Sequence, residues 1–171
     1  MSFKKIEPKE IQGNVIAAFD NGWGLVTAGT PDSYNTMTIS WGQMGCLWNR
    51  PVCTVYIRPC RHTYQFTQAQ ERFTVSLFDK ETCRQPLMTL GSKSGRDMDK
   101  MHDSGLTPMD FDGCIGYGEA KYVLVVRKLY DQQFDASLVP EEVGSTMYKG
   151  VADDDLHRQY ICLIEAVYAQ E

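Results

Sequence analysis

Two segments of this chain carry residue types that suit a ligand with a flat ring and a phosphate. The first, residues 35–42, alternates between hydroxyl and apolar side chains, so a strand here would separate them onto two faces. One face would carry Thr36, Thr38 and Ser40, and the other would carry Met37, Ile39 and Trp41. Hydroxyl groups and backbone beside a tryptophan suit a planar ring with polar edges.

The second segment, Arg58-Pro59-Cys60-Arg61-His62-Thr63, supplies donors where a strand should end and a helix should begin. Arginine, threonine and the free N–H groups of a helix start are a donor set that binds phosphate. Arg61 and Thr63 are the main candidates, Arg58 would add a second guanidinium, and His62 would be a minor ligand. The alternative is that the arginines pair with surface carboxylates. A ring plus a phosphate, without a nucleotide-type glycine loop, indicates flavin mononucleotide (FMN).

Further candidates lie in residues 92–100, where Lys93, Ser94 and Lys100 accompany a glycine and an arginine. Such a loop can turn N–H groups toward an anion. It lacks the Gly-x-x-x-x-Gly-Lys pattern, and the alternative is a solvated loop. Its aspartates resemble a calcium loop, but a histidine stands where glycine is required, so no metal site is predicted. His157 is either a polar group near the ligand or a loop histidine paired with an aspartate.

Composition restricts the class of protein. A chain of 171 residues is expected to form a single domain, and its net charge of −5 argues against a nucleic-acid-binding protein. The N-terminus lacks the apolar core of a signal peptide, and no long apolar run is seen, so we expect a cytoplasmic protein without a membrane segment. The six cysteines lack a Cys-x-x-Cys pair and are expected to be reduced.

The pattern of apolar residues predicts at least six strands and two or three short helices. Strands are expected at 24–29, 36–42, 51–58, 72–78, 119–130 and 160–168, and helices at 61–70 and 80–91. An N-terminal arm is expected at 1–20, with loops at 43–50 and 92–105 and a left-handed helix cap at Gly91. Strands follow strands through short turns, which favours an antiparallel barrel or sandwich.

Four segments, taken together, resemble the flavin reductase-like, FMN-binding split-barrel proteins, in the branch that includes flavoredoxin. These segments are 35–42, 51–63, 94–100 and 155–161, which follow the family's order over most of residues 20–168. The resemblance implies a mainly β fold, a six-stranded antiparallel split barrel of the Greek-key type with a few short peripheral helices. It also implies non-covalent FMN near the subunit interface of a homodimer.

The resemblance assigns roles to several residues. It places residues 35–41, including Asn35, along the isoalloxazine ring, Arg61 and Thr63 at the phosphate, and Lys100 or Lys93 near the cofactor. The sequence departs from the family's pattern at Cys60, where threonine is more usual, and at Cys162-Leu163, where a Gly-Glu pair is expected. Cys60 would remove one phosphate donor.

The expected activity is that of a small FMN-dependent oxidoreductase. Asn35, Thr36 and Thr38 are candidates to stabilise the negative charge that develops on the reduced ring. Electrons would come from NAD(P)H or a protein donor and pass to a flavin, a protein or an organic acceptor. The sequence has no dinucleotide fingerprint, so a nicotinamide would visit only transiently. The alternatives are a pure electron carrier, or a binding module for another cofactor such as a haem-like or pyridoxal group.

Overall fold

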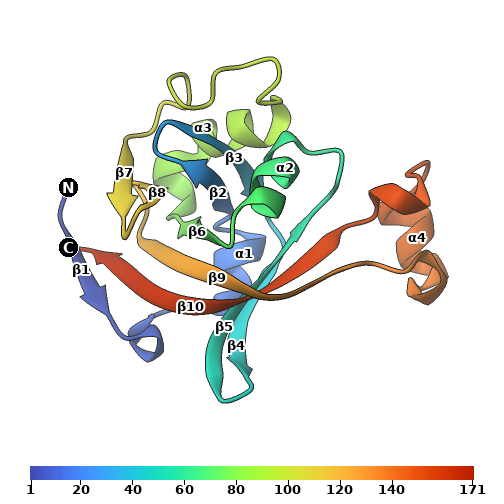
Figure 1. Ribbon diagram of the computed structural model, residues 1–171, viewed down its shortest axis with the longest axis horizontal. Helices are drawn as coiled ribbons and strands as arrows, with labels where there is room; N and C mark the ends of the chain where they lie inside the picture. The colour runs from blue at the N-terminus through green and yellow to red at the C-terminus, as the bar shows by residue number, and fades with distance from the viewer.

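The computed structural model describes residues 1–171 except for the side chain of Lys80. Eight strands form one antiparallel sheet in the order β3-β2-β6-β9-β10-β5-β4, with β1 paired to β10, and β7 and β8 form a separate pair (Figure 1). The strands are β1 Phe3–Ile6, β2 Gly24–Thr30, β3 Ser33–Ile39, β4 Gly42–Leu47, β5 Arg50–Ile57, β6 Arg72–Leu77, β7 Pro108–Phe111, β8 Cys114–Tyr117, β9 Tyr122–Gln133 and β10 Arg158–Gln170. The predicted mainly β, antiparallel fold is confirmed. The structure has more strands than the six that the family resemblance implied, in agreement with the apolar pattern, which predicted at least six.

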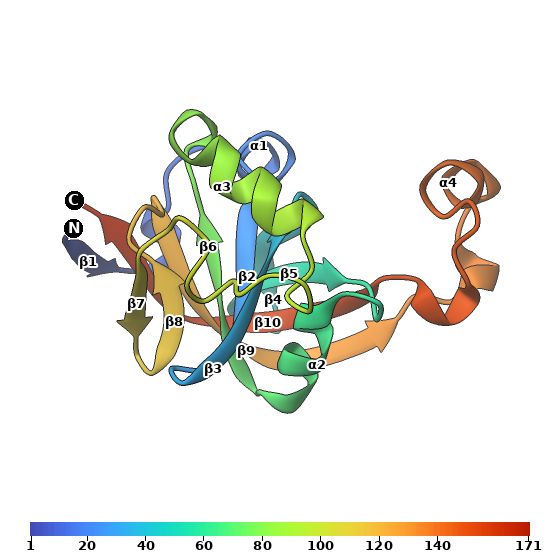
Figure 2. The same cartoon turned by 90° about the horizontal axis from the view of Figure 1, so that it is seen from above.

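Four α-helices and three short 3-10 helices accompany the sheet. The α-helices are α1 Val15–Asp20, α2 His62–Ala69, α3 Lys80–Ser92 and α4 Glu141–Met147; the 3-10 helices are Pro8–Glu10, Ala136–Leu138 and Asp153–Asp155. Figure 2 shows α3 lying across the sheet near β2 and β3, whereas α4 stands away from the body. Residues 134–157, which include α4, connect the end of β9 to the start of β10, and we call this segment the arm.

The core consists of two clusters of buried side chains, one on each side of the sheet. Phe73, Val75 and Leu77 lie in one cluster, as their alternation predicts. The start of β9 is buried on both faces, since Leu124 contributes to the first cluster and Val123 to the second. This burial on two sides explains why the sequence there is continuously apolar.

Residues 43–50, predicted as a loop, form strand β4 and the turn of a hairpin. Trp48 and Asn49 occupy the turn with φ angles of 52° and 57°, between Leu47 and Arg50, which pair directly. Two successive left-handed residues are typical of a two-residue hairpin turn. The prediction failed because glycines interrupt the apolar pattern and Trp-Asn is an unusual sequence for such a turn.

The N-terminal segment, predicted as an arm, is part of the packed body. β1 pairs with β10, and the Asn14 side chain caps α1 by accepting bonds from the N–H groups of Ile16 and Ala17. Phe19 on α1 is 2% exposed. A Cβ atom at Gly42 would lie 2.2 Å from the Phe19 ring, so only glycine lets α1 pack this closely on β4.

Candidate functional site

The segments that the sequence singled out meet where β3, the start of α2 and the end of α3 come together. A hollow of about 210 Å³ lies there, and we call it the α2 hollow. Its lining includes Asn35, Arg61, Thr63, Ser94, Gly95 and Lys100. An adjoining hollow of about 160 Å³, the β3 hollow, shares Met37 and Arg61 with it. The structure therefore brings most of the predicted site residues into one continuous region.

The start of α2 presents unpaired backbone donors to the α2 hollow. The helix begins at His62, after β5 ends at Ile57, so its first N–H groups have no partner within the helix. Thr63 is 1% exposed, and its hydroxyl accepts a 2.6 Å hydrogen bond from the Asn35 amide. Asn35 therefore fixes the hydroxyl of Thr63 from the neighbouring strand. A helix start of this kind is a ready site for an anion.

Two cations hold the end of α3 at the other side of the α2 hollow. Arg61 Nη2 donates to the Gly91 carbonyl at 2.7 Å, and Lys100 Nζ donates to the Leu90 and Thr36 carbonyls at 2.8 and 2.9 Å. The Leu90 and Gly91 carbonyls belong to the last turn of the helix, where the helix itself supplies no donors. The two cations therefore replace water as the cap of α3.

Gly91 does not form the predicted left-handed cap, because α3 continues to Ser92 and Lys93 caps it with a φ of −87°. Instead, a Cβ atom at Gly91 would lie 3.3 Å from the Thr38 side chain. The glycine therefore serves the close approach of α3 to β3.

The α2 hollow carries positive charge without a matching carboxylate. Lys100 is 4% exposed, and among the described side chains neither Lys100 nor Arg61 forms an ion pair. Burial, with the nearby Arg61 charge, lowers the pKa of Lys100 from 10.5 to about 8. Buried charges in proteins are normally paired. This arrangement suits an anion that is supplied from outside the chain.

The loop after α3 completes the α2 hollow. Ser94 Oγ accepts a bond from the Arg96 N–H at 3.1 Å, and Arg96 Nη1 donates to the Cys60 carbonyl at 3.2 Å. Arg96 is a lining residue that the sequence analysis did not select, although it lies within the Ser-Gly-Arg segment. Lys93 also lines the hollow and is exposed.

His62 lies on the wall that the α2 hollow shares with the neighbouring loop. Its ring bonds the Gln65 amide at 3.0 Å. Burial, followed by the charges of Arg96 and Lys100, lowers the pKa of His62. The imidazole is therefore biased toward its neutral form, in which it is a weak ligand for an anion.

Arg58 is not available as the predicted second phosphate fork. Its Nη2 pairs with the Asp155 carboxylate, and its Nε donates to the Asp155 carbonyl at 3.1 Å. The same carboxylate accepts the Cys60 N–H at 2.7 Å. Arg58 therefore ties the end of the arm to the loop after β5, which is the surface-carboxylate alternative that the sequence left open.

The predicted row of free hydroxyls is reduced to Ser40, which directly follows the end of β3 at Ile39. Thr36 is fully buried, and its hydroxyl bonds Thr27 Oγ1 at 2.9 Å and the Val26 carbonyl at 3.3 Å. Thr38 donates to the Leu87 carbonyl at 2.5 Å. These hydroxyls are used because α3 and the β7–β8 pair cover this face of β3. Ser40 is exposed and lines the β3 hollow.

Three aromatic side chains line the β3 hollow: Trp41, Tyr56 and His157. Trp41 is 43% exposed and lies against His157, with ring centroids 4.8 Å apart. His157 Nδ1 is hydrogen-bonded to the Tyr148 hydroxyl at 2.7 Å. Burial is the main cause that lowers the pKa of His157 from 6.5 to about 4, and the charge of Arg58 adds to it. The imidazole is therefore neutral at pH 7. Tyr148 was not identified from the sequence, because it joins the site only through the fold of the arm.

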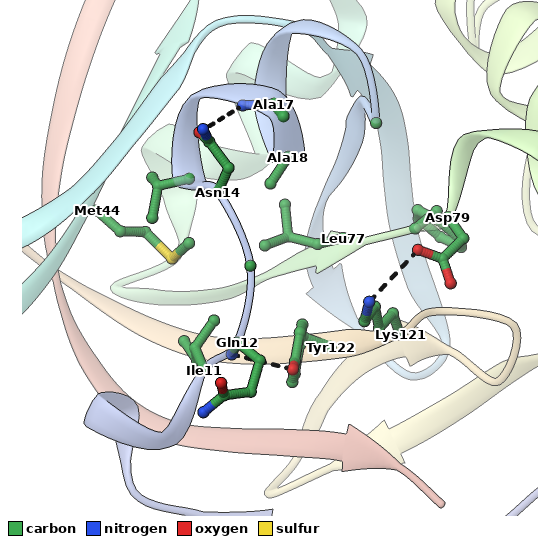
Figure 3. A pocket seen from close by; sticks show the side chains of 14 residues that line it. Ile11, Gln12, Asn14, Ala17, Ala18, Met44, Leu77, Asp79, Lys121 and Tyr122 are labelled. Carbon is green, nitrogen blue, oxygen red and sulfur yellow. Dashed lines mark hydrogen bonds and ion pairs between the residues drawn. The ribbon is translucent and has the colours of Figure 1, made fainter.

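A separate hollow of about 210 Å³ lies beneath α1 (Figure 3). Gln12 N–H donates to the Tyr122 hydroxyl at 3.2 Å, and Lys121 pairs with Asp79 at 3.6 Å across its edge. None of the predicted site residues lines it. In the described part of the chain, no helix is long and apolar enough to cross a bilayer, and no group of three His, Cys, Asp or Glu side chains is placed to hold a metal. All six cysteines have free thiols.

Comparisons with known proteins give a consistent result. The family model described as the flavin reductase like domain matches residues 16–140. Flavoredoxin from Methanosarcina acetivorans superposes with a TM-score of 0.67 at 18% identity, covering 97% of this chain and 77% of that one. The FMN-binding protein from Thermus thermophilus with bound p-hydroxybenzaldehyde gives 0.69 at 18%, covering 97% and 83%. The styrene monooxygenase flavin reductase from Pseudomonas putida S12 gives 0.65 at 16%, covering 91% and 83%. Curated proteins give no match.

Proposed function

Because this chain belongs to the flavin reductase like domain family, we propose that it binds FMN and works as a flavin-dependent oxidoreductase. The observation that carries the proposal is the uncompensated positive charge of Lys100 and Arg61 in the α2 hollow. A phosphate monoester carries nearly two negative charges and would supply the missing partner. The family match and the structural similarity to an FMN-binding protein also support flavin binding.

The residues present fit FMN. The N–H groups at the start of α2, the guanidinium of Arg61 and the hydroxyls of Thr63 and Ser94 would hold the phosphate, with Lys100 behind them. The β3 hollow, with Ser40 and the aromatic wall, would hold the isoalloxazine ring. Bound FMN supplies hydride and one-electron chemistry itself.

The chain contributes position and electrostatics to that chemistry. The backbone of β3 and the Asn35 amide are fixed by hydrogen bonds, so they need little reorganisation when negative charge develops on the ring. Neutral His157, held by Tyr148, would limit access of water to the ring beside Trp41. The Thr36 and Thr38 hydroxyls already donate to backbone carbonyls, so these hydroxyls would not stabilise negative charge on the ring.

The proposal includes a homodimer. The arm leaves the body of the protein (Figure 2), and large apolar side chains on it are exposed, among them Met147 at 59%. A second copy could cover them beside the β3 hollow. Six free thiols are in keeping with a reducing compartment such as the cytoplasm. NAD(P)H or a redox partner protein would supply the electrons.

The test begins with the visible absorption spectrum of the purified protein. We expect flavin bands, or their appearance as FMN is added, together with quenching of FMN fluorescence at a stoichiometry of one per chain. Anaerobic addition of NADH or NADPH then distinguishes a reductase, whose bound flavin bleaches within seconds, from an electron carrier, whose flavin stays yellow. A protein that binds pyridoxal phosphate but not FMN would overturn the proposal.

A further inference from the structure

A larger hollow adjoins the outer side of Trp41, between the body and the arm. Its volume is about 440 Å³, which falls in the usual range of small-molecule sites, and we call it the arm hollow. Its apolar walls are formed by Trp41, Phe134, Leu138, Val139, Pro140 and Val143. Residues of β9, β10 and α4 contribute, so the hollow depends on the arm as well as on Trp41.

The charges of the arm hollow exclude most nucleotides. None of its described lining residues is a lysine or arginine, and the one charged group is Asp135. The Asp135 carboxylate bonds the Ser137 N–H and hydroxyl, which lowers the pKa of this carboxyl group and keeps it ionised. A pyrophosphate or phosphate would therefore meet a carboxylate and no cation. An uncharged ligand is favoured.

The polar groups of the arm hollow suit a carbonyl compound. Three glutamines line it, at positions 132, 133 and 159. The Gln133 amide donates to the Leu156 carbonyl, and the Gln132 oxygen accepts the Tyr130 hydroxyl, which leaves the Gln132 N–H groups free to donate. Apolar and aromatic walls with a few polar groups are typical of small-molecule sites, and amide N–H groups are donors that suit carbonyl oxygens.

Trp41 connects this hollow to the proposed flavin site. The tryptophan lines both the arm hollow and the β3 hollow, so its indole lies between a ring in one and a ring in the other. We propose that the arm hollow binds an uncharged, ring-shaped carbonyl compound of the quinone class as the electron acceptor. A quinone takes up two electrons and two protons to become a hydroquinone. An anionic, two-electron-reduced flavin would supply both electrons and one proton, and water would supply the second proton. The acceptor role rests on the proposed function, whereas the binding site does not.

The test is equilibrium dialysis of menadione, an uncharged naphthoquinone, against the purified protein with and without FMN. Val143→Glu places a carboxylate in the wall of the hollow, at a side chain that is 37% exposed, and we expect it to weaken menadione binding by about tenfold or more. The control is Ser145→Glu, which adds the same charge to α4 at an exposed position outside the hollow and should change binding less than about twofold.

The outcomes separate the two proposals. Equal loss in both variants, or no menadione binding by the parent, overturns the acceptor site. A loss in Val143→Glu that coincides with a change from dimer to monomer, measured by light scattering, also overturns it, because the hollow is then an interface between copies. FMN binding is measured in the same samples. Menadione binding without FMN binding overturns the proposed function and supports the acceptor site. FMN binding without menadione binding supports the proposed function and overturns the acceptor site.

Discussion

At the scale of single residues, the α2 hollow is defined by cations whose hydrogen bonds go to backbone carbonyls. Lys100 and Arg61 satisfy the end of α3, yet their charges remain without an acidic partner among the described side chains. Desolvation of such charges costs stability, and proteins that keep them usually gain a function in exchange. The protein is therefore expected to be more stable when an anion is bound.

Removing the direct phosphate donors should weaken ligand binding more than it weakens folding. We predict that Arg61→Ala with Thr63→Ala weakens FMN binding by about a hundredfold, because two charge-assisted or hydroxyl bonds to the phosphate are lost. Fluorescence titration with FMN gives the affinity, and urea unfolding gives the stability. The control is Arg84→Ala with Thr82→Ala, which makes the same changes at exposed positions of α3 outside the hollow. If the Arg61/Thr63 variant holds FMN as tightly as the control, the phosphate site is misplaced.

Lys100 predicts a dependence of FMN binding on pH. Its pKa is about 8 in the folded protein without ligand, below the ordinary 10.5, so it loses its charge as the pH rises through 8. FMN affinity should therefore fall by several-fold, about tenfold at most, between pH 7 and pH 9. The Lys100→Met variant should show weak binding that no longer changes in this interval.

The stability of the ligand-free protein should change in the opposite direction. Between pH 8 and 10.5 the unfolded chain binds more protons at this lysine than the folded chain does, so the contribution of Lys100 to the free energy of unfolding rises with pH. A parent protein whose urea midpoint and FMN affinity both fall through pH 8 would contradict the assignment of a buried, charged Lys100.

At the scale of elements, the packing of α1 on β4 depends on one glycine. We predict that Gly42→Ala lowers the free energy of unfolding by about 2 kcal/mol, because its Cβ atom would lie 2.2 Å from the buried Phe19 ring. Gly45→Ala in the same strand is the matched control, since nothing lies within 4 Å of its Cβ atom. Urea denaturation measures both. Equal effects on the two variants would show that strand propensity, and not the contact with α1, is responsible.

Much of the element pattern could be predicted from the sequence, and much of the site could not. The inward residues of β6 follow from the alternation of apolar and polar residues. The predicted ends of α2 and α3 lie within a few residues of the observed ends. The pairing of Arg58 with Asp155 joins residues 97 positions apart, so no local pattern reveals it. The burial of Thr36 was missed for a similar reason: α3 and β8 cover a strand face that alternation alone presents as open.

At the scale of the whole molecule, the arm is the part that a single copy leaves incompletely covered. We predict that the purified protein is a dimer and that Met147→Asp, at a position of α4 outside the arm hollow, converts it to a monomer, because this side chain is 59% exposed. Light scattering measures the mass, and circular dichroism tests whether the fold is kept. Lys4→Gln, at an exposed position of the N-terminal segment, changes the net charge by the same amount and is the control. A parent that is already monomeric would contradict the dimer.

The place of β10 in the sheet has a consequence for biosynthesis. This strand comes after all the others in the chain, yet it lies between β9 and β5 and also carries β1. While the ribosome is still translating, the earlier strands have no central partner and their edges stay open. The loop of the proposed phosphate site, whose Cys60 N–H is held by Asp155 just ahead of this strand, can take its final form only after β10 has been made. If the proposed site holds FMN, the cofactor is therefore expected to bind only after β10 has joined the sheet.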